Sequence, residues 1–364
     1  MKIAIMHDWF DQVLGGSELV AIHIAKLFPE ADIFTMLYNE QKFGDKLRGR
    51  TIKISNLQKI PSRLRTNHKL LLPLIPQALK RLDFSGYDLV ISSSPAFSKN
   101  ITVPASAKHL TYCHSPMRFA WDYWPKYIDE QSFGLVRKTL ANLIIPKIRK
   151  WDLEGVKGVD LWLANSNTVK GRIGKYYGVN DVEVLYPPVN LKDKLRIVEN
   201  KDDYYVTLGA LTPYKRIDLA IKACNLSRRK LIVMSDGPQR RELEAIAGDT
   251  IKFVGFVSGE QKWDILRRSR GLIFPTIEDF GMAPIEAMAV GVPVIALKDG
   301  GLTETVEDHV SGVFFEEQTS DAIIQALDVV ESINFDYRKI AESTSKYSSE
   351  VFDKRFKQIV KDLS

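Results

Sequence analysis

Short apolar runs rich in β-branched residues alternate with longer amphipathic stretches along the whole chain, and this alternation restricts the fold more than any other feature. Several runs are apolar at nearly every position, as expected of parallel strands buried on both faces. Strands that alternate with helices predict a parallel sheet covered by helices on both sides. The strands expected in the first half are Lys2–Phe10, Asp32–Leu37, Ile52–Ser55, Asp88–Ser93, His109–His114 and Leu161–Asn165.

The second half of the chain repeats this scheme with strands and helices of similar length. Its expected strands are Tyr205–Gly209, Lys230–Met234, Ile251–Phe256, Gly271–Pro275, Val294–Leu297 and Gly312–Phe315. Its expected helices are Ile217–Cys224, Gln239–Ala247, Gly259–Arg268 and Pro284–Val290. Two such series predict an α/β protein of two doubly wound, Rossmann-like domains whose ligand loops face one central cleft.

The segment around Pro187 and Pro188 marks the expected domain boundary, because two prolines end a strand and the polar stretch that follows has little periodicity. We therefore expect one Rossmann-like domain over residues 1–188 and a second over residues 189–346. A C-terminal helix over about residues 347–364 is expected to pack back onto the first domain.

Composition excludes several classes of protein. The 364 residues are 45% hydrophobic and 26% charged, which is typical of a globular chain of about two domains and not of a disordered or collagen-like one. The two cysteines lie far apart without a Cys-x-x-Cys motif, which argues against a structural zinc site and a secreted disulfide framework. The N-terminus runs directly into a strand, and no apolar run approaches membrane-spanning length. We expect a cytoplasmic protein.

Positive charge is concentrated in the first half, where residues 1–188 hold 26 Lys+Arg against 17 Asp+Glu, compared with 25 against 28 in the remainder. Nucleic acid, an anionic membrane or a phosphorylated substrate could each explain this asymmetry. Residues 53–82 and 137–151 mix Lys and Arg with Leu, Ile and Pro, as peripheral membrane surfaces do. The alternative is a set of helices packed on the sheet with solvated cations. No RNA-binding module or DNA-reading motif is present, so we expect no nucleic-acid partner.

Two motifs in the first half follow expected strands. Gly15 and Gly16 precede an amphipathic helix, and adjacent glycines at a helix start let an anion approach the backbone N–H groups. Ser17 is alternatively the N-cap of that helix. His114 ends another strand and so is expected to face the ligand edge, with the planar donor fork of Arg118 nearby. A histidine that only satisfies a loop carbonyl is the structural alternative.

Two further motifs lie in the second half. Lys215 and Arg216 follow its first strand and precede a helix, which is a favourable place for a phosphate clamp, although such a pair is often simply solvated. Glu278 and Glu286 lie on either side of a strand–loop–helix turn with seven residues between them. A carboxylate there can accept hydrogen bonds from a ribose diol, whereas the alternative is capping of the helix start by acids. The backbone N–H groups of Gly281, Met282 and Ala283 are expected to face an anion.

The block EDFGMAPIEAMAVGVPVIA, which contains both glutamates, resembles the signature of the retaining glycosyltransferases of family 4, which have the GT-B fold. Other matching pieces occur in the expected order along nearly the full length. They are Gly15-Gly16, residues 112–118, 164–166 and 186–188, Gly209–Arg216, residues 235–238 and 253–257, and residues 300–304. The segments HSPMRFAWD and ALTPYKRIDLAI are most similar to bacterial mannosyltransferases of polysaccharide and O-antigen assembly.

The resemblance implies a nucleotide diphosphate sugar as donor, with GDP-mannose favoured, and a catalytic set comprising Glu278, His114, Lys215 and Arg216. Glu278 contacts the transferred sugar, His114 lies beside it on the acceptor side, and the two cations neutralise the diphosphate. Glu286 holds the ribose in this scheme. The remaining donor-binding residues are Gly15, Gly16, Phe256, Val257, Phe280, Gly281, Met282 and Ala283. Many members have an arginine where this chain has Ala210, and Arg216 is expected to supply the missing cation.

The family transfers its sugar with retention and without a protein nucleophile, and the chain contains no Asp-x-Asp triplet. We therefore expect metal-independent transfer of a hexose, without any cofactor, to a lipid-linked or oligosaccharide acceptor in bacterial surface glycan synthesis. Contact with the inner face of an anionic membrane is expected for a lipid-diphosphate-linked acceptor. The alternatives are a UDP-sugar donor (glucose, galactose or GlcNAc), a non-catalytic nucleotide-sugar-binding protein, a sugar phosphorylase or an epimerase.

Overall fold

The computed structural model describes residues 1–12, 14–65, 68–122, 135–191 and 196–363. The chain divides into two compact units, Met1–Tyr186 with Asp353–Ser364, and Pro187–Phe352. The division falls two residues before the boundary expected from the sequence. Part of the polar stretch after that boundary, residues 192–195, lies outside the described residues.

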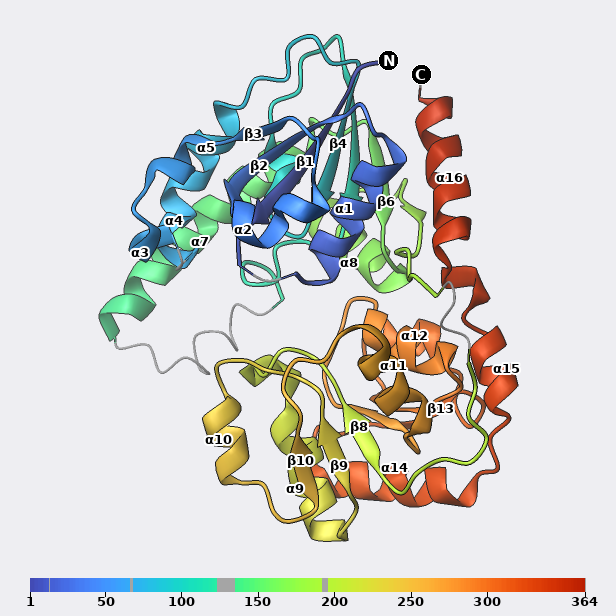
Figure 1. The fold of residues 1–364 in the computed structure, drawn as a ribbon. Coiled ribbons are helices and arrows are strands. Elements are labelled where there is room, and N and C mark those ends of the chain that lie inside the picture. The colour runs from blue at the N-terminus through green and yellow to red at the C-terminus, as the bar shows by residue number, and fades with distance from the viewer. Residues whose placement is uncertain (13, 66–67, 123–134, 192–195, 364) are drawn as a thin grey trace. The chain divides into compact units, whose positions relative to one another are not determined.

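The first unit is built on a sheet of seven parallel strands in the order β3-β2-β1-β4-β5-β6-β7 (Figure 1). Six of the strands match the expected ones to within two residues at each end. The seventh, β7, was not predicted from the sequence. The strands are β1 Ile3–Phe10, β2 Asp32–Tyr38, β3 Ile52–Ile54, β4 Leu89–Ser94, β5 Lys108–Cys113, β6 Leu161–Ala164 and β7 Glu183–Val184.

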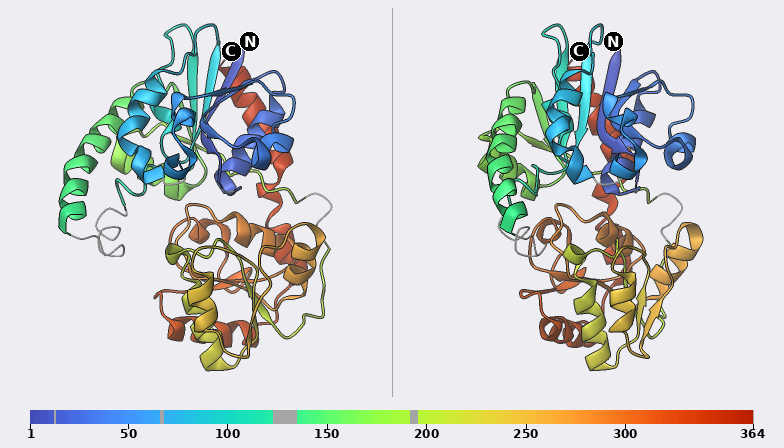
Figure 2. Two further views of the ribbon diagram at one scale, coloured as in Figure 1. Left: turned by 60° about the vertical axis from the view of Figure 1, so that its left-hand side comes forward. Right: turned by 90° about the vertical axis from the view of Figure 1, so that its left-hand side faces the viewer.

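Helices cover both faces of this sheet, and Figure 2 shows α1 and α7 on opposite sides of it. A large core lies between the sheet and the helices α5 and α7, and a smaller one lies under α8. The helices are α1 Gly16–Leu27, α2 Glu40–Phe43, α3 Ser62–Arg65, α4 His68–Leu71, α5 Ile75–Lys80, α7 Leu135–Val156 and α8 Asn167–Tyr177. Short 3-10 turns are η1 Gly44–Lys46, η2 Asn56–Lys59, η3 Leu72–Leu74 and η4 Ser98–Asn100.

The second unit contains a sheet of six parallel strands in the order β10-β9-β8-β11-β12-β13. All six were expected from the sequence, and four of them are shorter than expected, by one to three residues at an end. The strands are β8 Tyr205–Thr207, β9 Leu231–Val233, β10 Ile251–Phe253, β11 Leu272–Phe274, β12 Val294–Leu297 and β13 Gly312–Phe315.

A large core of the second unit lies between this sheet and the helices α9 and α14, where most side chains are fully buried. The helices are α9 Ile217–Ser227, α10 Arg240–Ala245, α11 Gly259–Arg268, α12 Met282–Ala289, α13 Leu302–Thr305, α14 Ser320–Ser332 and α15 Tyr337–Glu342, with the turns η5 Pro213–Lys215 and η6 Ser345–Tyr347. Helix α12 begins two residues before the expected start at Pro284, which lies in its first turn.

Helix α16 (Ser349–Asp362) closes the chain, and its residues from Asp353 onward belong to the first unit. Arg355 forms a two-pronged ion pair with Glu183, with N–O distances of 2.6 and 2.7 Å. His23 and Asp353 lie 2.6 Å apart, and the ring of Phe356 packs near that of Phe28. These contacts attach the C-terminal helix to α1 and to the short edge strand β7.

The two sheets share one strand order. When the strands are numbered within each unit, both sheets run 3-2-1-4-5-6, and the first sheet adds a seventh strand at its end. In such a sheet the chain reverses direction between the first and fourth strands, and ligands bind beyond the carboxyl ends of the strands at that point. The two switch points are β1/β4 in the first unit and β8/β11 in the second.

Candidate active site

An ion pair spans the switch point of the second unit. Lys215 comes from the loop after β8, Glu278 comes from the loop after β11, and the Lys215 ammonium binds Glu278 Oε1. The ammonium also lies 5.1 Å from the ring of Tyr214 and 5.7 Å from that of Phe274. Because β8 and β11 are neighbours in the sheet, the fold brings together two residues that are 63 positions apart.

Helix α12 begins four residues after Glu278. Gly281 is its N-cap residue, with φ at +88°, and as a glycine it provides no side-chain cap. A left-handed backbone at this place favours glycine, since a Cβ is strained there. Met282 and Ala283 are half-buried and follow directly. The start of α12 can therefore accept an anion, as the sequence predicts.

Two glycines in the loop after β12 pack closely against the backbone of the Glu278 segment. Gly301 donates its backbone N–H to the Glu278 carbonyl at 2.8 Å. A Cβ on Gly300 would lie 2.4 Å from that same carbonyl oxygen, and one on Gly301 would lie 2.3 Å from the carbonyl oxygen of Asp279. Only glycine allows this close approach of two backbones, so the loop after β12 determines where Glu278 lies.

Glu286 forms a second ion pair, in which Lys262 Nζ lies 2.6 Å from its Oε2. Glu286 is on α12 and Lys262 is on α11, and both side chains are about one-fifth exposed. The sequence analysis did not single out Lys262, because a lysine on an amphipathic helix usually faces solvent. Each of the two glutamates of the signature is thus matched with a lysine from a different element.

Arg216 lies next to Lys215 but points to a different partner. Its backbone is left-handed, with φ at +51°, and it serves as the N-cap residue of α9. Its Nε lies 3.2 Å from Asp218 Oδ1 in the first turn of the same helix. Of the two cations of the predicted clamp, Lys215 is therefore paired with Glu278 and Arg216 with Asp218.

The residues expected to meet the base differ strongly in exposure. Phe256 is 80% exposed after β10, whereas the side chain of Val257 is buried. Phe280 is also buried, with its ring 5.4 Å from that of Tyr347. Phe280 and Val257 can therefore reach a ligand only through their backbone atoms, and the exposed ring of Phe256 is the one side chain of these three that is accessible.

In the first unit, Gly15 is the N-cap residue of α1, and Glu18 Oε2 accepts a hydrogen bond from its backbone N–H at 3.0 Å. The alternative of Ser17 as N-cap is wrong, since Ser17 is inside the helix and its hydroxyl binds Glu18 Oε2. A Cβ on Gly15 would lie 2.8 Å from that carboxylate oxygen, so the Glu18 side chain would have to shift if another residue stood there. Gly16 is exposed at the start of the helix.

His114 follows β5 and is half-buried, with Nε2 2.8 Å from Ser93 Oγ on the neighbouring strand β4. Its carbonyl accepts a hydrogen bond from the side chain of Asn165 at 3.0 Å. Burial lowers the pKa of His114 to about 3, and the nearby charge of His7 lowers it further than Glu18 raises it. The ring is therefore neutral at physiological pH. Arg118 is half-buried four residues later.

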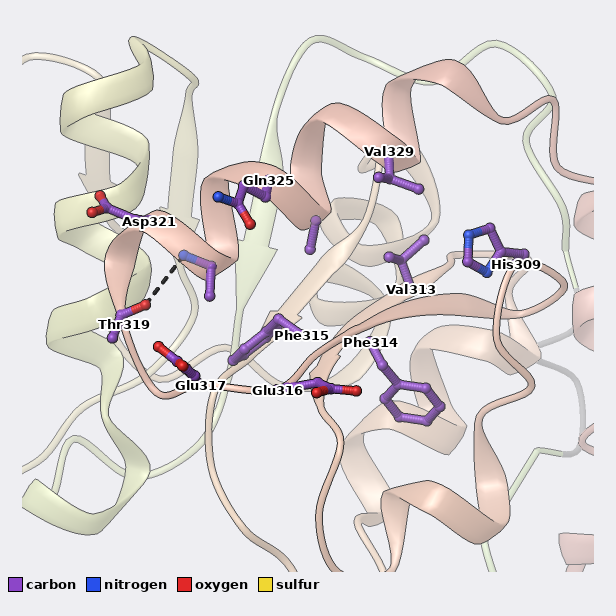
Figure 3. Close-up of a pocket in the computed structure, with 12 residues that line it drawn as sticks. His309, Val313, Phe314, Phe315, Glu316, Glu317, Thr319, Asp321, Gln325 and Val329 are labelled. Atoms are coloured by element: carbon purple, nitrogen blue, oxygen red, sulfur yellow. Dashed lines mark hydrogen bonds between the residues drawn. The ribbon is translucent and has the colours of Figure 1, made fainter.

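A surface pocket with a volume of about 610 Å³ lies along the edge strand β13 and helix α14 (Figure 3). Glu316 and Glu317 stand at the end of the strand, with Asp321 and Gln325 on the helix. No residue of the predicted site lines this pocket. We therefore base the candidate site on the switch points and not on the pocket.

Comparison with known families agrees with this arrangement. A family model described as "Glycosyltransferase Family 4" matches residues 14–193, and one described as "Glycosyl transferases group 1" matches residues 191–348. The chain belongs to glycosyltransferase family 4. The family assigned by resemblance in the sequence analysis is thus confirmed.

Curated relatives include mannosyltransferases. The α-1,3/1,6-mannosyltransferase ALG2 of Saccharomyces cerevisiae is 27% identical over 262 residues, which cover 57% of this chain and 50% of that protein. The O-antigen chain mannosyltransferase RfbU of Salmonella typhimurium is 30% identical over 200 residues, which cover 49% of this chain and 56% of that protein. The chain spans about half the length of these curated relatives.

Among solved structures, HepE from Anabaena in complex with UDP is similar over the full length of both chains, with a TM-score of 0.72 and 16% identity. This similarity confirms the GT-B fold expected from the sequence, with its two parallel-sheet domains. The expected central cleft stays a prediction.

The basic segments of the first half are only partly explained by packing. Leu57, Leu71, Ile75 and Leu79 are buried in the core, as the packing alternative predicts. In contrast, the side chains of Leu64, Leu70, Leu74 and Leu143 are about half or more exposed. The side chains of residues 137–141 lie outside the described residues.

Other expectations concern cysteines, membrane spans and metals. Cys113 and Cys224 are buried free thiols, and burial raises the pKa of Cys224 to about 12. Within the described ranges, no helix is both long and apolar enough to span a bilayer. The same ranges contain no group of three or more His, Cys, Asp or Glu residues arranged to hold a metal ion.

Proposed function

We propose that the chain is a retaining hexosyltransferase that moves mannose from GDP-mannose to a lipid-linked or oligosaccharide acceptor in bacterial surface glycan synthesis. The observation that carries this proposal is the Lys215–Glu278 pair at the β8/β11 switch point, next to the uncapped start of α12. A cation and free N–H groups suit a diphosphate, and a carboxylate suits sugar hydroxyls. This site can thus bind both the diphosphate of a donor and the hydroxyl groups of its sugar.

The other donor contacts follow from the same segment. Glu286 accepts hydrogen bonds from the ribose hydroxyls through the carboxylate that Lys262 holds at 2.6 Å. The backbone near Phe256 and Val257 meets the base, and Arg216 adds a second positive charge for the phosphates. Arg216 thereby compensates for Ala210, which carries no charge where many family members have arginine.

We assign no metal and no cofactor to the reaction. Lys215, Arg216 and the first turns of α1 and α12 supply positive charge and N–H donors to the leaving diphosphate, as a divalent cation does in other enzymes. Transfer that is unchanged in excess EDTA supports this assignment. Loss of transfer in EDTA that returns with added Mg²⁺ or Mn²⁺ contradicts it.

Retention without a protein nucleophile assigns the acceptor proton to the leaving phosphate oxygen, on the same face as the attack. Glu278 then binds and orients the transferred sugar. His114 supplies a neutral imidazole on the acceptor side, which can donate or accept one hydrogen bond without carrying charge. The glycosidic bond to the donor breaks as the bond to the acceptor oxygen forms.

The donor is the point at which a second candidate has support. Mannose is favoured because two relatives are named mannosyltransferases, whereas the structural neighbour HepE is solved with UDP. A thermal-shift series with GDP-mannose, UDP-glucose, UDP-GlcNAc, GDP and UDP separates the two. We expect stabilisation by GDP and GDP-mannose, and a Glu286→Gln variant should lose most of it. Stabilisation by the uridine compounds alone overturns the proposed donor.

We also propose contact of the first unit with an anionic membrane. Leu64, Leu70 and Leu74 are exposed beside the basic residues of α3 and the neighbouring turns. Flotation with vesicles that contain anionic lipid should recover the wild type, and Leu70→Glu should reduce the recovery. Leu226→Glu on the second unit, where the leucine is 67% exposed, is the matched control. Equal recovery with purely zwitterionic vesicles contradicts an electrostatic contact.

A further inference from the structure

A chain of buried polar contacts runs through the first unit from the glycine loop to His114. It begins at Gly15, whose N–H binds Glu18 Oε2 at 3.0 Å, and the other oxygen of Glu18 lies 3.7 Å from His7 Nε2. His7 Nδ1 lies 2.9 Å from the backbone carbonyl of Ser93, and Ser93 Oγ lies 2.8 Å from His114 Nε2. Residues from α1, β1, β4 and the end of β5 meet at the β1/β4 switch point.

The geometry of His7 determines where its protons lie. Its side chain is fully buried, and Nδ1 faces a carbonyl oxygen, which only accepts, so Nδ1 carries a hydrogen. Nε2 faces a carboxylate oxygen at 3.7 Å, which is too long for a hydrogen bond but within the range of an ion pair. Glu18 thus lies on the Nε2 side of the His7 ring, and the Ser93 carbonyl lies on the Nδ1 side.

Several groups contact the Glu18 carboxylate. Burial raises the pKa of Glu18, but the nearby His7, with donors from the backbone and from Ser17, outweighs this and leaves the pKa below its usual value. The carboxylate is thus ionised and has contacts on both oxygens. Asp8, next to His7, accepts hydrogen bonds from the backbone of Phe97 and Ser98 and fixes the turn after β4.

We propose that His7 and Glu18 are positioning residues, through which Glu18 fixes the Gly15-Gly16 loop and His7, by way of Ser93, holds the His114 ring. The inference deepens the proposed function, on which it rests, because the loop and His114 are the two elements that the first unit contributes. Ser93 is the link, since its carbonyl binds one histidine and its hydroxyl binds the other. Neither His7 nor Glu18 contacts the donor or acceptor in this scheme.

The other groups that face His114 do not provide the same coupling. Tyr112 packs against the imidazole, with ring centroids 5.1 Å apart, and its burial raises the pKa of its hydroxyl well above the usual value, so it stays neutral. Asn165 binds only the backbone carbonyl of His114. Among the described residues, His7 and Glu18 are therefore the groups whose charge affects the pKa of His114.

The test measures the state of the His114 ring directly, by ¹⁵N imidazole NMR of the full chain without ligand. Glu18→Gln should change the tautomer populations of His114, and Ser93→Ala should change them while leaving the backbone carbonyl that binds His7. Ser93→Thr restores the hydroxyl and should restore the wild-type spectrum. Asp353→Asn is the matched control, because it removes a carboxylate partner of another histidine on α1, His23.

Kinetics supply the second readout. In variants that keep the wild-type melting temperature, Glu18→Gln and Ser93→Ala should lower kcat about tenfold, the scale of one lost hydrogen bond to a charged or reacting group. Asp353→Asn should leave kcat unchanged. An unaltered His114 spectrum in folded Glu18→Gln overturns the coupling. A wild-type enzyme that transfers no sugar from any nucleotide donor instead overturns the proposed function, whatever the spectra report.

Discussion

The two units share one strand order but hold their polar residues at the switch points in different ways. In the second unit, Lys215 and Glu278 reach each other from two loops and keep 13% and 20% of their side chains exposed. In the first, His7 and Ser93 lie on the strands themselves and are fully buried. One framework thus produces charged, partly solvated pairs at one switch point and a buried hydrogen-bonded chain at the other.

This difference has a physical consequence for binding. A lysine near solvent can exchange its carboxylate partner for a phosphate at small cost, because water screens the change. A buried imidazole cannot move or change its charge without losing hydrogen bonds that water does not replace. The second unit is therefore suited to bind and release an anion, and the first unit is suited to keep a neutral group in one orientation.

The largest effect is expected from the exposed pair of the second unit. Glu278→Gln keeps the shape of the side chain but removes the charge that faces Lys215, and we expect kcat to fall about 10²–10³-fold, the scale of losing one placed electrostatic group. The rate of product formation from the nucleotide sugar measures the change in kcat. Glu317→Gln, in the pocket along β13, is the control and should retain full activity. If the control falls as far as Glu278→Gln, the site lies elsewhere.

The second prediction compares the stability of the two units at acidic pH. Burial lowers the pKa of His109 to about 4 and that of His114 to about 3. In the unfolded chain both rings take up a proton near pH 6.5, whereas in the native state they do not. The free energy of unfolding of the first unit should therefore fall as the pH drops below about 6.5, by roughly 2 kcal/mol per histidine at pH 5. The second unit contains one histidine, His309, which is exposed.

Hydrogen exchange resolved by unit, at pH 7 and pH 5, measures this difference. Protection in the first unit should decrease more than in the second, and His309→Gln should leave both values unchanged. Equal losses of protection in the two units would mean that buried histidines do not determine the acid response.

The third prediction contrasts two glycines. Gly301→Ala places a Cβ 2.3 Å from the Asp279 carbonyl, so the loop that carries Glu278 must move, at a cost of about 1–3 kcal/mol in stability. Gly171→Ala in α8 meets no atom within 4 Å and should instead stabilise the chain by about 0.5–1 kcal/mol. Urea unfolding measures both variants. Donor affinity should fall in Gly301→Ala alone, and a normal affinity there would separate the glycine contact from the site.

The smallest effect is expected at Lys262, which pairs with Glu286. Lys262→Met should weaken binding of the nucleotide about two- to fivefold, since a partly exposed ion pair contributes little, and Lys262→Arg should restore it. Calorimetry with GDP measures the change. Lys298→Met, which removes an ion pair with Glu316 in which both side chains are more than half exposed, is the control. Tighter binding in Lys262→Met would mean that the lysine competes with the ribose.

Hydrophobic periodicity was enough to predict twelve of the strands, because a parallel strand buried on both faces is apolar at nearly every position. It missed β7, whose two residues, Glu183 and Val184, are half-buried and form too short a run to show a pattern. The sequence also offered Ser17 as the N-cap of α1, because serine is common at that position. The structure uses Gly15 instead, and its backbone N–H donates a hydrogen bond to the Glu18 carboxylate.

The candidate site divides in the same way. Glu278 and Glu286 could be found from the sequence because of their spacing around a strand–loop–helix turn, and Lys215 because it follows the first strand of the second unit. His7 and Lys262 could not, since a histidine inside an apolar strand and a lysine on an amphipathic helix have ordinary structural explanations. The sequence analysis did not use the Gly-x-x-Glu spacing of Gly15 and Glu18. This spacing is compatible with the capping contact that the two residues form at the start of α1.

By itself, the sequence determined the α/β class, the order of elements and the residue types at the ends of the strands, because these depend on local periodicity and on spacing along the chain. Only the tertiary structure decided which of those residues pair. Lys215 meets Glu278 because β8 and β11 are neighbours, and His7 reaches His114 through Ser93 because β4 lies between β1 and β5. Pairing across a sheet depends on strand order, which a local pattern does not contain.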